Sequence, residues 1–171
     1  MFGFFKNDEK EDEKSETGII ENPVFGKLKY IHTWWSFDRI DVTMFGKTYS
    51  ITYSVASNEQ KEAPDSIQEE TFKRFMSEKE KFQSKVEKVV SEELGLDGTF
   101  DIGEVINVTR LCISRDGKCG IEMEIREEYL DEIDLDELDI IPDNSFGVAV
   151  LPELYIIKSS DRFSEIFVEQ K

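Results

Sequence analysis

The sequence predicts an α+β fold, an antiparallel β-sheet with one long amphipathic helix packed on one face. Three patterns support this prediction: segments in which apolar and polar residues alternate, one long apolar series with helical spacing, and an Asp-Gly dipeptide between two alternating segments. The expected order of elements is β-β-β-α-β-β-(acidic segment)-β-β. The 171 residues are enough for one domain. We expect residues 19–171 to form it and the charged residues 1–18 to form a flexible tail.

Alternation with a period of two residues indicates three strands between Val24 and Val55. The first covers 28–34, the second 40–44 and the third 49–55, each with one apolar and one polar face. Because the turn at 45–47 is very short, the second and third strands are expected to pair antiparallel.

A single helix is predicted from Ser66 to Leu94. Ser66 and Glu69 have the spacing of a capping box, and Gly95 can adopt the left-handed conformation that ends many helices. A helix of this length spans about 45 Å, which is long for a small sheet, so it is either continuous or divided near Ser77. Its apolar side chains recur at helical spacing: Phe72, Phe75, Met76, Phe82, Val86, Val89, Val90 and Leu94.

The second half of the chain predicts a hairpin and two short strands. Segments 105–114 and 118–126 flank Asp116-Gly117, a dipeptide that favours a type I′ turn. The acidic segment from Glu127 to Asp143 has apolar spacings that fit a helix, and it fits an extended flap equally well. The last residues are expected to dock as a strand or a helical turn, after strands at 146–151 and 154–158.

The composition is strongly acidic. Thirty-eight acidic residues against 21 basic ones give a formal net charge of −17. A field of this sign repels phosphate backbones and anionic lipid headgroups, which argues against nucleic-acid binding. The charge is uneven, because nine of the acidic residues and no basic ones lie between Glu127 and Asp143. A basic protein is the partner that fits such a segment.

The sequence also indicates a cellular compartment. No apolar stretch approaches the roughly 20 residues of a membrane span, and the apolar run at the start is too short for a signal peptide. Cys112 and Cys119 would lie diagonally across the expected hairpin, so we expect two free, buried cysteines and no disulfide. Together these features predict a cytoplasmic protein.

Residues that carry out chemistry in enzymes are sparse. His32 is the only histidine, and its expected strand places it beside aromatic side chains, so we expect a partly buried histidine rather than a general base. Gly46-Lys47-Thr48 lacks the first glycine of a phosphate-binding loop, and the aspartates after Ile133 lack the glycine of a calcium loop. We therefore predict no catalytic, metal-binding or cofactor-binding residues.

Trp34 and Trp35 are neighbours on an expected strand, so their side chains should point to opposite sides of the sheet. The tryptophan on the outer side is either an exposed contact residue or a cover for the sheet edge beside the helix. We take Trp35 as the candidate contact residue.

Several short motifs follow one another in a recognisable order: Phe25-Gly26-Lys27-Leu28-Lys29-Tyr30, Trp34, Met44-Phe45-Gly46-Lys47, the Asp116-Gly117 hairpin and Phe146-Gly147-Val148-Ala149-Val150. Between residues 22 and 158 this order resembles an uncharacterised family of bacterial cytoplasmic domains that includes suspected immunity proteins of polymorphic toxin systems. The resemblance implies a protein that binds a toxin, and it assigns no catalytic residues. The chain differs from the family pattern at 130–143, where an acidic insertion replaces a Trp-Asp-x-Glu segment.

The leading hypothesis is a non-enzymatic, acidic protein-binding module, an immunity protein that covers a basic toxin domain. Acidic side chains would steer the partner, and aromatic side chains would supply the desolvated contact. Two alternatives remain open: a small carboxylate-dependent hydrolase, with two acids converging in a pocket, and a structural or oligomer-forming module. The candidate partner-binding residues are Trp35, Glu127, Glu128, Tyr129, Asp131, Glu132, Asp134 and Asp136.

Overall fold

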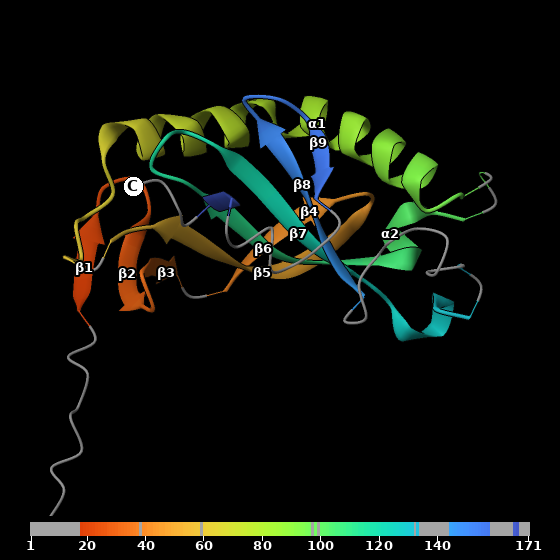
Figure 1. The fold of residues 1–171 in the computed structure, drawn as a ribbon, viewed down its shortest axis with the longest axis horizontal. Coiled ribbons are helices and arrows are strands. Elements are labelled where there is room, and N and C mark those ends of the chain that lie inside the picture. Colours follow the sequence, from red (N-terminus) through yellow and green to blue (C-terminus); the bar gives the residue numbers. More distant parts are fainter. Residues whose placement is uncertain are drawn as a thin grey trace, which may run out of the picture.

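A computed structural model describes residues 18–37, 39–58, 60–96, 98, 100–131, 133, 144–157 and 166–167. Among these residues the predicted α+β fold is confirmed: a mostly antiparallel sheet of nine strands carries one long helix on one face (Figure 1). None of the described helices is both long and apolar enough to cross a membrane. The expected tail lies outside the described residues except for Gly18, whose carbonyl oxygen accepts a hydrogen bond from the Tyr30 amide at 2.9 Å.

The N-terminal half forms more strands than expected. The single strand expected at 28–34 is wrong, because His32 and Thr33 both have positive φ, 45° and 63°, and form a tight turn. The turn separates two antiparallel strands that pair Ile31 with Trp34. The strands in this half are β1 (Ile19–Asn22), β2 (Gly26–Ile31), β3 (Trp34–Phe37), β4 (Ile40–Met44) and β5 (Lys47–Ala56).

Strands β3 and β4 both pair antiparallel with β5, and β3 pairs with its C-terminal half. The pairings run from Trp34 opposite Ala56 in β3 and from Ile40 opposite Ile51 in β4. The predicted antiparallel pairing around the short turn is confirmed, with Phe45 and Gly46 both at positive φ between β4 and β5.

Helix α1 (Ser66–Glu93) is continuous. The expected capping residue is wrong: the N-cap is Asp65, whose carboxylate accepts a hydrogen bond from the Gln68 amide at 3.0 Å. Gln68 is fully buried, and its side chain also donates to the Ala56 carbonyl oxygen at 2.9 Å, which ties the helix to the end of β5. The helix ends as predicted at Gly95, which has a φ of 64°. Met76, expected on the apolar face, is 40% exposed.

One strand pair is parallel. After α1, the short helix α2 (Ile102–Val105) leads into β6 (Ile106–Ile113), which pairs parallel with β5 from Thr52 opposite Arg110 to Val55 opposite Ile113. The parallel pairing arises because α1 carries the chain back across the sheet, so β6 starts at the end where β5 starts (Figure 1).

The remaining strands are antiparallel: β7 (Cys119–Ile125), β8 (Ser145–Leu151) and β9 (Tyr155–Ile157). The predicted β6–β7 hairpin is confirmed, but its turn is not type I′. Only Gly117 has a positive φ, 83°, and the Ser114 amide donates to the Lys118 carbonyl oxygen at 3.0 Å across a three-residue loop. This geometry matches a type I turn followed by a left-handed glycine.

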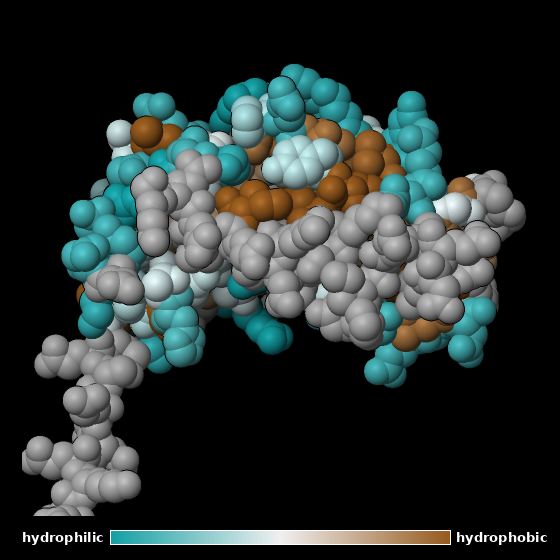
Figure 2. All heavy atoms as spheres, viewed as in Figure 1, coloured by the Kyte–Doolittle hydropathy of each residue, from teal (hydrophilic) through white to brown (hydrophobic). Residues whose placement is uncertain are grey.

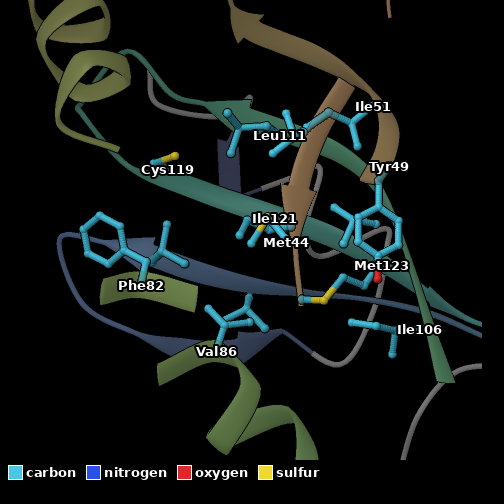
Figure 3. Close-up of a cluster of buried hydrophobic side chains, with 14 of the residues drawn as sticks. Met44, Tyr49, Ile51, Phe82, Val86, Ile106, Leu111, Cys119, Ile121 and Met123 are labelled. Carbon is cyan, nitrogen blue, oxygen red and sulfur yellow. The ribbon is translucent and has the colours of Figure 1, made fainter. Parts of the chain in front are cut away.

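The main core lies between α1 and the sheet. Figure 3 shows side chains of β4 to β7 and of α1 pointing toward one another around Ile121 and Met44. The opposite face of the sheet has a smaller apolar cluster of its own: Trp34, Ala56, Cys112, Ala149, Ile157 and Phe167. Phe167 therefore docks on the sheet, in keeping with the expectation that the last residues pack against the domain.

Both cysteines are free and buried, as predicted. Cys112 lies opposite Gly120, and Cys119 lies opposite Ile113. These two cross-strand pairs are neighbours along the hairpin, and side chains alternate between the faces of a sheet, so the two thiols lie on opposite faces. Burial raises the pKa of Cys112 to about 12, and burial also raises the pKa of Cys119 well above its usual value.

We expect neither thiol to react with an aromatic disulfide reagent at mildly alkaline pH while the protein is folded, because only an accessible thiolate attacks. Both should react at once in concentrated guanidinium chloride. The release of the coloured thiolate measures the reaction. Stoichiometric labelling of the native protein within seconds would contradict the burial of that cysteine.

Gly103 is required by a close backbone contact. A Cβ atom at this position would lie 2.3 Å from the Phe45 carbonyl oxygen, where α2 packs on the β4–β5 turn. We expect Gly103→Ala to lower the free energy of unfolding in urea by about 3 kcal/mol. Gly18→Ala is the control, because its Cβ would meet Trp35 at an ordinary 3.6 Å. Equal effects of the two substitutions would refute the close contact.

Candidate acidic interface

The described part of the acidic segment begins where β7 ends. The Arg126 amide donates to the Val105 carbonyl oxygen at 2.9 Å, and the chain then turns through the 3-10 helix η1 (Glu127–Tyr129). The Ile133 amide donates to the Tyr129 carbonyl oxygen at 3.2 Å, and the Ile133 side chain is buried. These contacts hold the start of the segment against the domain.

Glu127, Glu128 and Asp131 are exposed. None of them forms an ion pair with another residue in the part of the chain that the structure describes. Glu122 differs, because both its oxygens accept hydrogen bonds from Arg110, at 2.8 and 3.2 Å. The charge at η1 is therefore open to solvent and to any partner.

A hollow of about 360 Å³ that opens to solvent is lined by two of these residues, Glu127 and Glu128. Asn107 of β6 and Glu124 of β7 are opposite each other in the sheet and form one wall. We did not predict either of them, because cross-strand register is needed to see that they join η1. The lining residues are Asn107, Glu124, Ile125, Arg126, Glu127 and Glu128.

Arg126 is the one cation among the residues that line the hollow, and its guanidinium is turned inward. Its Nε donates to the Ile106 carbonyl oxygen at 3.2 Å. Burial raises the pKa of Tyr49, and the nearby Arg126 charge partly opposes that rise. Because Arg126 is engaged with the interior, three glutamates dominate the open side of the hollow.

An aromatic pair lies next to the acidic residues. The rings of Phe100 and Tyr129 meet edge to face, with centroids 5.9 Å apart. Phe100 is 37% exposed, and Tyr129 is half-buried against the core. Where Figure 1 shows the cyan turn of η1, Figure 2 shows a small apolar patch between hydrophilic side chains. Tyr129 was a candidate from the sequence, whereas Phe100 was missed because its partner is 29 residues away in the chain.

Trp35 is wrong as an exposed contact residue. It is only 2% exposed, and its Nε1 donates to the Glu62 carbonyl oxygen at 2.7 Å. Ser57 donates to the same oxygen at 2.8 Å, so Trp35 fixes the connection between β5 and α1. Trp34 is also buried, because the opposite face of the sheet is covered at this point by the cluster around Phe167.

Three further candidates, Glu132, Asp134 and Asp136, lie outside the described residues. The structure therefore brings together Glu127, Glu128, Tyr129 and Asp131 from the sequence-based set, and adds Asn107, Glu124 and Phe100 from other elements. We call Phe100, Glu124, Glu127, Glu128, Tyr129 and Asp131 the acidic interface.

His32 does not lie where it was expected. It is exposed in the β2–β3 turn, rather than partly buried beside aromatic side chains. Within the described ranges, no three His, Cys, Asp or Glu side chains are arranged so that they could hold a metal ion. The exposed carboxylates of the acidic interface attract positive charge.

Comparison with known proteins does not extend these observations. No family model matches the chain. No curated protein and no solved structure matches it either.

Proposed function

We propose that this chain is a non-enzymatic binding protein whose acidic interface holds a basic protein partner. The observation that supports this proposal most strongly is the exposure of Glu124, Glu127 and Glu128 around one hollow, without an ion pair to another described residue. Like charges that line one hollow repel one another, and a second cation beside Arg126 would reduce that repulsion further.

The net charge favours fast association with such a partner. The chain carries −17 overall, and more than half of that number is contributed by the nine acids of 127–143. A strongly negative charge raises the association rate of basic partners and disfavours acidic competitors. The rings of Phe100 and Tyr129 offer an apolar contact of the kind found at the centre of stable protein interfaces.

The resemblance of the sequence motifs to immunity proteins suggests what the partner is. On this proposal the protein works in the cytoplasm and covers the basic surface of a toxin domain, as an inhibitor that needs no chemistry of its own. An inhibitor that blocks a toxin by shape and charge alone needs a preformed surface. The backbone hydrogen bonds of Arg126 and Tyr129 hold this part of the chain in place.

The two alternatives have less support. A hydrolase needs acids and a base around one pocket, but His32 is exposed in a distant turn of the chain and Glu122 is engaged by Arg110. A self-associating module that used the acidic interface would bring like charges together, which costs free energy. We therefore favour binding of a basic partner.

The test compares two triple variants with the same change in net charge. Glu124→Gln, Glu127→Gln and Glu128→Gln remove the charge at the hollow. Glu70→Gln, Glu80→Gln and Glu87→Gln remove three exposed charges from α1, which are likewise without ion pairs among the described residues. The probe is a fluorescent peptide with alternating Arg, Gly, Lys and Gly, and fluorescence anisotropy at low salt gives the dissociation constant.

We expect the interface triple to weaken binding by about tenfold or more, and the α1 triple by less than about threefold, because screening limits distant charges. Salt dependence of binding should also fall in the interface triple. Equal losses in both triples would mean that only net charge matters, and the proposal would then be wrong.

A further inference from the structure

We propose that Met76 on α1 is an oxidation site, and that the Tyr53 hydroxyl holds the sulfoxide oxygen formed there. The site shares no residue with the acidic interface. It is a contact between a partly exposed thioether and a buried phenol, in which the Tyr53 hydroxyl donates to the Met76 sulfur at 3.9 Å. This contact joins α1 to β5.

Tyr53 has a buried hydroxyl with only a weak hydrogen-bond partner. Its side chain is 4% exposed, and the Met76 sulfur is the one acceptor for its hydroxyl among the described residues. A thioether sulfur accepts weakly, whereas buried polar groups are usually well satisfied. Burial raises the pKa of Tyr53 to about 12, so the hydroxyl keeps its proton at neutral pH and remains a donor.

Two other aromatic rings pack around Tyr53. The centroid of its ring lies 5.0 Å from that of Phe72, edge to face, and 6.3 Å from that of Phe37. Phe72 precedes Met76 by about one helical turn, so α1 presents both side chains on the same face. Because the ring is held in this way, its hydroxyl stays next to Met76 when the sulfur changes chemically.

Met76 is the methionine that an oxidant reaches most easily among the described residues. It is partly exposed, whereas Met44 and Met123 are buried in the core, and an oxidant must touch the sulfur in order to react. Met1 lies outside the described residues. A small peroxide should therefore modify Met76 well before the two core methionines.

The reaction is the two-electron oxidation of a thioether by a peroxide. A sulfur lone pair attacks one oxygen of hydrogen peroxide, and the O–O bond breaks. The proton on the attacked oxygen moves to the other oxygen, which leaves as water. The thioether is oxidised to a sulfoxide and the peroxide is reduced, and methionine sulfoxide reductases can reverse the change.

The contact suits the sulfoxide better than the thioether. The 3.9 Å between the sulfur and the Tyr53 hydroxyl leaves room for the added oxygen to lie between them at hydrogen-bonding distance. Oxidation usually disrupts packing, because it introduces a polar atom among apolar ones. Here that atom meets a buried donor that lacks a strong acceptor, so oxidation should strengthen the contact between α1 and β5.

Peptide mapping tests the site of oxidation. Each of the four methionines lies in a different tryptic peptide, so mass spectrometry follows them separately. In dilute hydrogen peroxide, we expect Met76 of the native full chain to be oxidised at least about tenfold faster than Met44 and Met123. Comparable rates for the three would overturn Met76 as the oxidation site.

Thermal unfolding tests the role of the hydroxyl. We expect oxidation to raise the unfolding temperature of the wild type by about 2 °C, the effect of one added hydrogen bond in a domain of this length. Tyr53→Phe keeps the ring and removes the donor, so oxidation should leave its unfolding temperature unchanged or lower it. Met76→Leu is the matched control, and peroxide should not change its unfolding temperature.

The three proteins together decide the outcome. No rise in the oxidised wild type, or an equal rise in Tyr53→Phe, would overturn binding of the sulfoxide oxygen by Tyr53. An equal rise in Met76→Leu would assign the effect to another residue and overturn the proposal as well. The wild-type measurement needs no variant, so it can contradict the proposal even if Tyr53→Phe does not fold.

Discussion

The fold depends on the parallel pairing of β5 with β6 beneath α1. A parallel pair needs a long crossover, and α1 provides it while burying Phe75, Val86 and Val90 on the sheet. Because β6 lies between β5 and β7, its position also sets where the β6–β7 hairpin lies. The hydrophobic face of one helix thus determines the placement of half the sheet.

The acidic interface follows from that placement. At the end of the sheet where β6 begins and β7 ends, Asn107 faces Glu124, and the chain leaves through Arg126 into η1. Helix α2 lies at the same end because it directly precedes β6 in the chain. Phe100 lies there too, because it comes just before α2. Among the described residues, Glu124, Glu127 and Glu128 remain exposed there without an ion-pair partner, and the partly exposed Phe100 meets the half-buried Tyr129.

Local patterns in the sequence predicted most of the fold, and non-local ones were missed. The β4–β5 turn, α1 and the β6–β7 hairpin each depend on neighbouring residues and were found. The turn at His32 and Thr33 was missed because neither residue type favours positive φ enough to interrupt an alternating pattern. Trp35 was expected to be a contact residue because alternation shows only that Trp34 and Trp35 lie on opposite sides of the sheet. It does not show that both sides are covered. The acidic residues of η1 could be identified as candidates from the sequence. Phe100 and Glu124 could not, because only the strand register and the crossover show that they lie at the same end of the sheet.

Native-state hydrogen exchange tests the central role of the crossover most directly. The amides of 52–55 and 110–113, in the parallel ladder under α1, should exchange only by global unfolding and should respond to urea with the full unfolding slope. Amides of β1 (Ile19–Asn22), an edge strand in the described sheet, should exchange through smaller openings. If the ladder amides exchanged as fast as those of β1, the parallel pair would not be the frame that positions the acidic interface.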